Sequence, residues 1–431
     1  MYFSVKEIRL LTIYNILTYF VGFIIKFLAY INKKISKGVD GRKKTFTLLQ
    51  SHIKPEDKTI WFHCASLGEY EQGLPVFEDI KKLYPNHKII LTFFSPSGYE
   101  IRKTSPIADV VTYLPLDTKY NAKRFLKIVK PELVIFVKYE IWPNYLNTLK
   151  KKGIRTLLIS ALFRSNQVFF KSYGKWIQKT MTAFEHIFVQ NENSKQLLNR
   201  FGFNNVTISG DTRFDRVSNQ LNIDNTLDFI EDFKGDNICI VAGSTWPEGE
   251  KVLSNYINST TYSTLKYIIA PHNIKPKQIE SLKKTISKKV VLFSEKDNNK
   301  LIDFDVLIID TIGLLSKIYS YAEIAYVGGA IGKTGLHNTL EPATFGLPII
   351  IGNNFKKFPE AIEMQKNGGL FSINSDSDFN SILNKLVENK SFRDKSGASN
   401  KNYINKFFNS LVSTYHILTY LYHLQIYYSA I

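Results

Sequence analysis

The pattern of apolar and polar residues predicts short buried strands that alternate with amphipathic helices. In the first half of the chain the apolar runs lie at residues 59–64, 88–94, 109–114, 133–137, 156–159, 186–189 and 206–209. In the second half they lie at residues 237–242, 265–270, 290–293, 306–309, 324–327, 348–351 and 370–373. Strands and helices that alternate in this way are typical of parallel βαβ units. We therefore expect an α/β fold with two doubly wound domains.

A polar stretch at residues 218–236, rich in Asn and Asp, predicts the boundary between these domains. We expect an N-terminal domain at residues 37–217 and a C-terminal domain at residues 218–431. The segment from Phe407 to Tyr428 has Tyr, Leu and His at helical spacing, which predicts a helix that closes the C-terminal domain. No repeat with a period of about 20–50 residues is visible, which excludes solenoids and propellers.

A long apolar stretch near the N-terminus predicts a membrane anchor at residues 1–36. From Leu10 to Ile31 the residues are almost all apolar or aromatic, interrupted by Asn15 and Lys26. This length approaches the ~20 residues of a spanning helix, and the basic residues that follow suit a cytoplasmic side. A signal peptide fits poorly because no small-x-small cleavage site follows. Lys26 also suits a helix that lies in the membrane interface, and a buried core helix is the third alternative.

The composition adds a strong positive charge. The chain has 56 Lys and Arg against 38 Asp and Glu, which gives a formal net charge of +18. Such a charge favours polyanionic partners, namely nucleic acid, anionic lipid headgroups or phosphorylated substrates, although a Lys/Asn bias of the whole sequence is an alternative source. No zinc finger, helix-turn-helix or basic-aromatic platform is present in the sequence, so nucleic acid is disfavoured.

The two cysteines give no sign of a metal site or a disulfide. Cys64 and Cys239 lie in separate apolar runs, and neither has a second Cys or a His at metal-ligand spacing. We expect both to be reduced residues of the core, consistent with a cytosolic environment.

A carboxylate stands where the first predicted strand gives way to a helix. The apolar run at residues 59–64 is followed by Ala65, Ser66, Leu67 and Gly68 and then by Glu69. In open α/β sheets, ligands bind at this end of the strands. The carboxylate is either a general base or an acidic residue favoured by the helix dipole, and this segment alone is compatible with both.

Three segments of the second half carry further candidate chemistry. At residues 242–250 a strand is followed by Ser, Thr and Pro, which suits an anion-binding helix N-terminus or an ordinary capped helix. His272 follows the next strand and could contact a phosphate or a sugar carboxylate, or be a plain loop residue. Residues 327–343 are rich in glycine, and Asn338 and Glu341 are spaced to share a helix face and reach one ligand. This is not the GxGxxG fingerprint, so an NAD-dependent enzyme is disfavoured.

Seven sequence blocks occur together in an order that resembles one family of enzymes. These blocks are His63 to Glu69, Glu140 to Asn144, Ser160 to Ser165, Gly210 to Asp215, Ala242 to Glu250, Asp310 to Gly313, and Gly328 to Ala343. On these blocks the chain resembles the 3-deoxy-D-manno-octulosonic acid (Kdo) transferases of lipopolysaccharide synthesis. The apolar N-terminus, followed by Gly41, Arg42 and Lys43, is similar to the membrane anchor of that family and its basic exit.

The resemblance implies a GT-B glycosyltransferase fold, in which two Rossmann-like domains form the active site in the cleft between them. It also implies inverting transfer of Kdo from CMP-Kdo to the lipid A precursor lipid IVA. The implied location is the cytoplasmic face of the inner membrane. The partners are then the CMP-Kdo donor, the lipid A precursor and anionic inner-membrane lipids, with no nucleic acid and no cofactor.

The resemblance also assigns roles to individual residues. Glu69 matches the general base, and Glu140 and Arg213 match residues assigned to stabilisation of the transition state. The residues that match the CMP contacts of the family are Pro271, His272, Ile312, Gly313, Leu314, Asn338, Thr339, Leu340 and Glu341. Glu140 could instead form a plain ion pair with Lys138, and Arg164 of the third block could be a solvated loop charge.

Five positions depart from the pattern associated with the family. His272 stands where Arg is common, Arg213 replaces Lys, Leu314 replaces Glu, Trp246 replaces His, and Ala330 replaces Ser. Arg213 keeps its charge. A His at position 272 can be neutral near pH 7, and Leu314 can offer CMP only its backbone.

The sequence also leaves two alternative functions open and contains one motif that could bind a metal ion. One alternative is a GT-B envelope enzyme that uses a UDP-sugar, and the other is a non-catalytic membrane-bound binder of lipid or nucleotide. Asp376-Ser377-Asp378 matches the Asp-x-Asp metal motif of other glycosyltransferases. Because it stands just before a helical run, we expect N-capping there and no metal in the chemistry.

Overall fold

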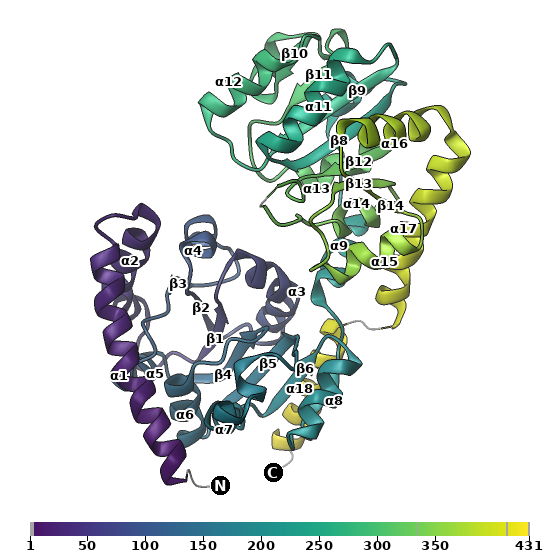
Figure 1. The fold of residues 1–431 in the computed structure, drawn as a ribbon. Helices are drawn as coiled ribbons and strands as arrows, with labels where there is room; N and C mark the ends of the chain where they lie inside the picture. The colour runs from purple at the N-terminus through teal and green to yellow at the C-terminus, as the bar shows by residue number, and fades with distance from the viewer. Residues whose placement is uncertain (1–3, 333, 411–412, 430–431) are drawn as a thin grey trace. The chain divides into compact units, whose positions relative to one another are not determined.

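The computed structural model describes residues 4–332, 334–410 and 413–429, and its contacts divide the chain into two compact units (Figure 1). Unit 1 comprises Met1–Arg216 and Leu411–Ile431, and unit 2 comprises Val217–Ser410. Each unit contains one parallel sheet of seven strands with helices on its faces. The α/β fold with two doubly wound sheets is therefore confirmed.

The sheet of unit 1 has the strand order β3-β2-β1-β4-β5-β6-β7. Its strands are β1 (Thr59–Cys64), β2 (Lys88–Phe93), β3 (Val110–Tyr113), β4 (Pro131–Val137), β5 (Arg155–Ala161), β6 (His186–Val189) and β7 (Val206–Ile208). The order reverses between β1 and β4, which pair in parallel. Ligands of doubly wound sheets bind beyond the carboxyl ends of the strands at such a switch point.

The helices of unit 1 precede, connect and follow these strands. They are α1 (Val5–Leu28), α2 (Lys33–His52), α3 (Leu67–Leu83), α4 (Pro96–Arg102), α5 (Lys119–Val129), α6 (Pro143–Lys151), α7 (Lys175–Met181), α8 (Glu192–Arg200) and α18 (Ser413–Ser429), with 3-10 turns η1 (Val168–Phe170) and η2 (Ser172–Gly174). Helix α9 (Thr212–Asn219) begins in unit 1 and ends in unit 2.

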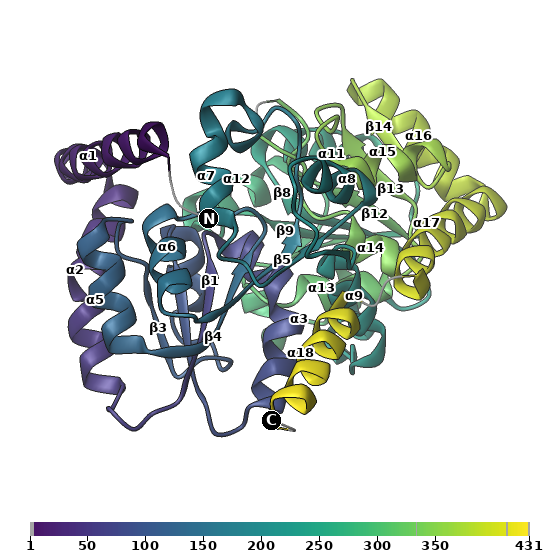
Figure 2. The ribbon, with the colours of Figure 1, turned by 90° about the horizontal axis from the view of Figure 1, so that it is seen from below.

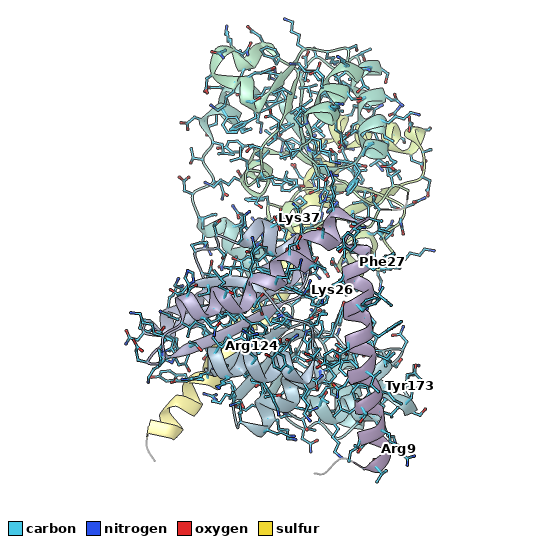
Figure 3. All side chains as sticks on the ribbon, turned by 90° about the vertical axis from the view of Figure 1, so that its left-hand side faces the viewer. Arg9, Lys26, Phe27, Lys37, Arg124 and Tyr173 are labelled. Atoms are coloured by element: carbon cyan, nitrogen blue, oxygen red, sulfur yellow. The ribbon has the colours of Figure 1, made fainter. Side chains whose placement is uncertain are left out.

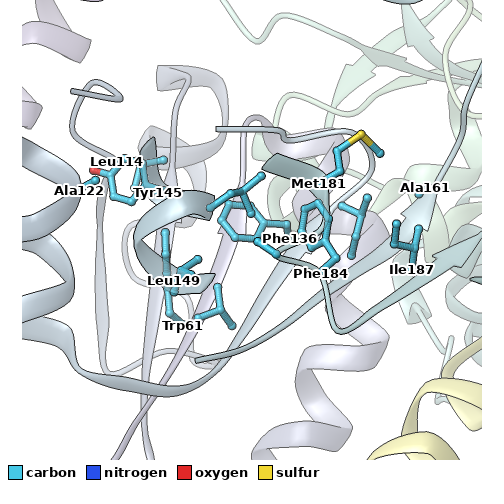
Figure 4. Packing of buried hydrophobic residues seen from close by; sticks show 14 of the residues in the cluster. Trp61, Leu114, Ala122, Phe136, Tyr145, Leu149, Ala161, Met181, Phe184 and Ile187 are labelled. Atoms are coloured by element: carbon cyan, nitrogen blue, oxygen red, sulfur yellow. The ribbon is translucent and has the colours of Figure 1, made fainter. Parts of the chain in front are cut away.

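Aromatic side chains fill the core on one face of the unit 1 sheet (Figure 4). The Trp61 ring of β1 is fully buried, and its centroid lies 4.7 Å from that of Phe125 and 5.3 Å from that of Phe136. All six residues of β1 are buried. Because both faces of the sheet are covered, its strands read as continuous apolar runs, which is why the sequence pattern locates them.

The sheet of unit 2 has the order β10-β11-β9-β8-β12-β13-β14. Its strands are β8 (Ile238–Thr245), β9 (Leu265–Pro271), β10 (Val290–Leu292), β11 (Val306–Ile308), β12 (Ile324–Val327), β13 (Ile349–Gly352) and β14 (Leu370–Ile373). Its helices are α10 (Asp228–Lys234), α11 (Pro247–Ser259), α12 (Pro276–Thr285), α13 (Leu315–Ile318), α14 (Leu340–Thr344), α15 (Pro359–Lys366), α16 (Asp376–Glu388) and α17 (Lys390–Ser410), with 3-10 turns η3 (Gln220–Asn222), η4 (Phe293–Asn298), η5 (Leu301–Asp303) and η6 (Tyr319–Tyr321). The switch point of this sheet lies between β8 and β12.

The C-terminal helix differs from the expected domain division. Instead of closing the second domain, α18 packs against α3 in unit 1, and Ile417 and Leu421 are fully buried in the core of that unit. The Tyr420 hydroxyl also donates to Glu185 at 3.1 Å. Helical spacing shows which face of a helix is apolar but not which sheet covers it, so the sequence assigned this helix to the wrong unit. Residues 411–412 of the expected helix lie outside the described residues.

The expected anchor at residues 1–36 is also part of unit 1, because α1 lies along this unit next to α2 (Figure 2). The Tyr14 hydroxyl donates to Asp117 Oδ2 at 2.8 Å, and Asn144 Nδ2 donates to Asn15 Oδ1 at 2.8 Å. The stretch Glu7–Leu28 is long and apolar enough to cross a membrane by length and composition alone. Only 6% of that stretch is buried, which excludes the alternative of a buried core helix.

Candidate active site

Glu69 lies in the first turn of α3, directly after β1, at the switch point of unit 1. The backbone N–H of Ser66 donates to Glu69 Oε2 at 2.6 Å, and the Ser66 hydroxyl donates to the same oxygen at 2.8 Å. Glu69 is 8% exposed. Its other oxygen, Oε1, accepts no hydrogen bond from any residue that the structure describes. One oxygen therefore caps the helix, as expected of an acidic residue at a helix start, and the other is available to take a proton, as expected of a general base.

Glu140 follows β4, the neighbour of β1 at the switch point. Lys138 has a φ of 70°, in the left-handed region that side chains rarely adopt, and this turns the chain sharply at the end of β4. Glu140 Oε2 then accepts a hydrogen bond of 2.9 Å from Trp142 Nε1 and lies 3.5 Å from His63 Nε2. Lys138 and Glu140 form no ion pair, so that alternative is excluded.

Hydrogen bonds beneath Glu140 assign a tautomer to the buried His63. Thr92 Oγ1 accepts from Trp61 Nε1 at 2.8 Å and donates to the Phe62 carbonyl at 3.3 Å. His63 Nδ1, 2.8 Å from the same hydroxyl, must then donate to it. The unprotonated Nε2 accepts from Trp142 Nε1 at 3.1 Å, so the indole N–H is shared between the imidazole and the carboxylate.

The sequence does not predict this network, because His63 and Trp142 are 79 positions apart. The available signal is chemical, since a buried indole N–H needs an acceptor and Glu140 is two residues away. The consequence of this network is that the Glu140 side chain is held in place. The Trp142 indole holds the Glu140 carboxylate at the end of β4 without neutralising its charge.

Glu69 and Glu140 follow two paired parallel strands, β1 and β4, and their charges act on the same two buried groups, Tyr139 and Cys64. Burial raises the pKa of Tyr139, and the charges of Glu69 and Glu140 raise it further. Burial likewise raises the pKa of Cys64 well above its usual value, with further contributions from the same two carboxylates. The buried thiol stays protonated, as expected for a structural cysteine. The structure thus brings Glu69 and Glu140 to one edge of the sheet.

Arg213 lies at the start of α9 and is held by Asp211. Its Nε donates to Asp211 Oδ2 at 2.8 Å, and Gln72 Nε2, from the same helix as Glu69, donates to Asp211 Oδ1 at 3.1 Å. Burial would raise the pKa of Asp211, but the Arg213 guanidinium and these hydrogen bonds outweigh it and hold the pKa below its usual range. Neither Asp211 nor Gln72 is predicted as a site residue from the sequence. Both position the guanidinium.

In unit 2, three aromatic side chains gather at the carboxyl ends of β8, β9 and β12. The rings of Trp246 and His272 are stacked with centroids 4.8 Å apart, and those of His272 and His337 are 4.4 Å apart. Trp246 Nε1 donates to His337 Nε2 at 2.8 Å. Burial lowers the pKa of His272, which favours its neutral form near pH 7. Neutral His272 can therefore offer a hydrogen bond to a ligand rather than a fixed positive charge.

Lowering the pH from about 6.5 to 4 is expected to destabilise unit 2 through His337. Burial, and then the neighbouring His272, lower the pKa of His337 to about 4. The unfolded chain takes up a proton near pH 6.5, whereas the folded chain resists it until about pH 4. The free energy of unfolding therefore falls as the pH is lowered through this window.

The pKa of His337 can be measured by NMR on the full chain with labelled histidine. The His337 resonance is assigned by its absence in a His337→Gln variant, whose amide oxygen can still accept from Trp246. Titration near pH 4 is expected. Titration at the ordinary value near 6.5 would contradict the buried Trp246 contact.

The remaining candidate CMP contacts form two adjoining loops. Ile312 is 77% exposed, and Gly313 has a φ of 95°, which favours glycine at this turn before α13. Asn338 Nδ2 donates to Glu341 Oε1 at 3.0 Å, and Ser316 of α13 donates to Glu341 Oε2 at 3.2 Å. The Ser316–Glu341 hydrogen bond joins the start of α13 to the start of α14.

The positions of five predicted contacts bear on what their side chains can do. Asn338 precedes α14 instead of sharing a helix face with Glu341, and its Oδ1 accepts from the Leu340 backbone N–H at 3.0 Å. The Leu340 side chain is fully buried, and Thr339 is 2% exposed. Pro271 ends β9 and is buried, whereas Leu314 is partly exposed before α13.

The Asp-x-Asp motif lies in the first turn of α16. The Ser375 hydroxyl accepts from the backbone N–H of Asp378 at 3.1 Å, and Asp378 Oδ2 accepts from the backbone N–H of Asn374 at 2.9 Å. These are the contacts of a helix start, so the predicted N-capping is confirmed. No group of three or more His, Cys, Asp and Glu suited to a metal ion occurs within residues 4–332, 334–410 and 413–429.

Sequence comparison finds a family model and individual relatives that carry the same description. Residues 40–216 match the family model described as 3-Deoxy-D-manno-octulosonic-acid transferase (kdotransferase). The chain is 29% identical over 345 residues to the 3-deoxy-D-manno-octulosonic acid transferase of Aquifex aeolicus, covering 77% of this chain and 86% of the relative. It is 28% identical over 360 residues to that of Haemophilus influenzae, covering 80% and 82%.

Solved structures show the same fold at low sequence identity. A glycosyltransferase from Rickettsia africae matches with a TM-score of 0.54 and 13% identity, covering 85% of this chain and 98% of that one. UDP-GlcNAc 2-epimerase from Neisseria meningitidis matches with a TM-score of 0.56 and 15% identity, covering 79% and 94%. The fold and the sequence relatives together define a glycosyltransferase with the GT-B fold.

Within that class the chain is similar to the Kdo transferases. The resemblance that its sequence blocks indicate is confirmed by the family model and by relatives that cover about four fifths of the chain.

Proposed function

We propose that this protein transfers Kdo from CMP-Kdo to the lipid A precursor lipid IVA, with inversion, at the cytoplasmic face of the inner membrane. The observation that carries the proposal is the Glu69 carboxylate, which has one oxygen without a hydrogen-bond partner among the described residues and lies in the segment that matches the Kdo transferase model. The family of its relatives supports the donor and the type of acceptor.

In the proposed reaction, Glu69 Oε1 takes the proton of an acceptor hydroxyl as that oxygen attacks the anomeric carbon of Kdo. The bond from this carbon to the phosphate of CMP breaks, and the phosphate keeps the electron pair. Attack from the face opposite the leaving group inverts the anomeric carbon. Glu140 stabilises the positive charge that develops on the sugar, and Arg213 stabilises the negative charge on the leaving phosphate.

The proposed donor site is in unit 2, at the carboxyl ends of its central strands. The loops at Ile312 to Leu314 and Asn338 to Glu341 present backbone and amide groups to CMP, and Pro271 and His272 line the adjoining strand end. Because the pKa of His272 is lowered by burial, we propose that it contributes a hydrogen bond while the phosphate charge is met elsewhere.

The test is an assay of the full chain with CMP-Kdo and lipid IVA, in which mass spectrometry counts the sugars on the product. Transfer of Kdo supports the proposal. Titration of CMP against UDP distinguishes the donor class, and tighter binding of UDP would favour a UDP-sugar enzyme. Binding of the lipid without transfer of any sugar would favour a non-catalytic binder.

A further inference from the structure

A cavity of about 380 Å³ lies in unit 1 between α1, α2 and the segment that leads into α5. Its walls are mostly apolar and include Phe23 and Ile25 of α1, Val39 and Phe46 of α2, and Leu116. This volume lies within the range of natural small-molecule pockets, about 300–1,000 Å³. An apolar cavity of this kind suits a hydrocarbon group.

The lining residues of this cavity include three cations, Lys26, Arg42 and Lys43, and no carboxylate. Arg42 donates to the carbonyls of Gly38 at 3.0 Å and Leu114 at 3.1 Å, and also to that of Phe94. Within the described part of the chain, neither Arg42 nor Lys26 forms an ion pair, whereas Lys43 pairs with a carboxylate on α2. Burial lowers the pKa of Arg42 to about 10, so it stays charged near pH 7.

The half-buried Arg42 guanidinium donates only to backbone carbonyls and lies over aromatic rings, so no carboxylate among the described residues balances its positive charge. Burying a charge in this way is costly unless an anion is nearby. Together with the free ammonium of Lys26, it makes the rim of the cavity complementary to an anion such as a phosphate. Apolar walls and a cationic rim fit an amphiphile with an anionic headgroup.

The cavity is connected by contacts to the Glu140 loop. The Arg42 guanidinium lies 4.4 Å from the ring centroid of Phe94, and this ring is 4.8 Å from that of Trp142, the residue that donates to Glu140. A second hollow, of about 240 Å³, is lined by Glu140 itself and by Tyr14 of α1. Helix α1 thus borders both the apolar cavity and the candidate active site.

The outer side of α1 is suited to a membrane surface (Figure 3). Phe23 is 70% exposed and Phe27 is 66% exposed, and Figure 3 shows Lys26 beside Phe27 towards the end of the helix. Polar contacts fix the inner side of this helix to unit 1 through Tyr14 and Asn15. A helix with these two sides can lie in the membrane interface and leave the cavity open to lipid.

We propose that this cavity binds one acyl chain of the lipid acceptor, while Lys26 and Arg42 contact a phosphate of its headgroup. The proposal rests on the proposed function and adds a binding site for the acceptor that none of the sequence motifs assigns. A lipid held there has its hydrocarbon against α1 and α2 and its headgroup towards the Glu140 loop.

The first test fills the cavity with a Val39→Trp substitution. Its matched control is Ile16→Trp, at a position of α1 that is 64% exposed and does not line the cavity. We expect Val39→Trp to raise the KM for lipid IVA at least about tenfold and to leave the KM for CMP-Kdo and the transfer to fully deacylated lipid IVA unchanged. An equal effect on both acceptors would overturn the proposal.

The second test removes a rim cation without altering the packing. We expect Lys26→Ala to raise the KM for lipid IVA several-fold, whereas Arg9→Ala, which removes an exposed cation of the same helix, leaves it unchanged. The difference should disappear with a dephosphorylated acceptor. Equal effects of the two substitutions would indicate general attraction to the membrane and overturn the specific contact.

The third test does not depend on transfer, so its failure is distinguishable from failure of the proposed function. Without CMP-Kdo, lipid IVA with a diazirine on an acyl chain is crosslinked to the full chain, and labelled peptides are identified by mass spectrometry. Labelling of α1, α2 and residues 115–121 that is lost in Val39→Trp supports the proposal. Labelling elsewhere, or equal competition by phosphatidylglycerol, would overturn it.

Discussion

Replacing Glu69 by Gln is expected to lower kcat for Kdo transfer by about 10²–10⁴, the usual contribution of a positioned general base. The amide oxygen of Gln can still accept from the Ser66 backbone and hydroxyl, so the start of α3 is preserved. What is lost is the oxygen that can take a proton. We expect the melting temperature to change little, because the helix cap is kept.

The matched control is Glu78→Gln, which removes an exposed carboxylate from the same helix and should leave kcat unchanged. Product formation is followed by mass spectrometry, and folding by thermal unfolding of each variant. If Glu69 acts only as a helix-start residue, Glu69→Gln retains transfer. That result would remove the base from the proposed mechanism even if the protein is a Kdo transferase.

The strands could be predicted from the sequence because of how the sheets are covered. Each expected apolar run coincides with a strand, from β1 at Thr59–Cys64 to β14 at Leu370–Ile373. A parallel sheet with helices on both faces buries every side chain of its central strands, so those strands are apolar without alternation. Ser66 marks the start of α3 for a similarly local reason, since Ser and a Glu three residues later are typical of a helix start.

Contacts between distant segments could not be predicted from such local patterns. The destination of α18 depends on a hydrophobic face of α3 that no residue near Ile417 encodes. The His63–Trp142 hydrogen bond depends on β1 and β4 being neighbours, which is a property of strand order. The resemblance to the Kdo transferases assigns a role to Glu140, but only the structure shows that the Trp142 indole donates a hydrogen bond to it.

In unit 2, the sequence located the loops but not the directions of their side chains. Asn338 and Glu341 were expected to reach one ligand together, yet they hydrogen bond to each other, and Ser316 engages the second oxygen of Glu341. Trp246 stands out in the sequence only as a departure from a familiar pattern. In the structure its indole N–H donates to His337 Nε2, while burial and the neighbouring His272 lower the pKa of that histidine.

Replacing Arg213 by Met is expected to lower kcat by about 10²–10³, the typical cost of removing a charge that stabilises a leaving group. Arg213→Lys should retain most of the activity, because it keeps the cation and the ion pair with Asp211, although it loses the fork of donors. Both variants are measured with saturating CMP-Kdo, so that kcat is separated from donor binding.

A loss of kcat in Arg213→Met could also arise because Asp211 loses its ion-pair partner. A double variant distinguishes this structural explanation from stabilisation of the leaving phosphate. If Arg213 served only to neutralise Asp211, then Asp211→Asn combined with Arg213→Met would restore transfer, because neither charge would remain unpaired. A stabiliser of the leaving phosphate cannot be restored in this way. Arg216→Met is the control, since it removes a cation of the same helix that pairs with Glu71 at 2.6 Å, and it should change kcat by no more than about twofold.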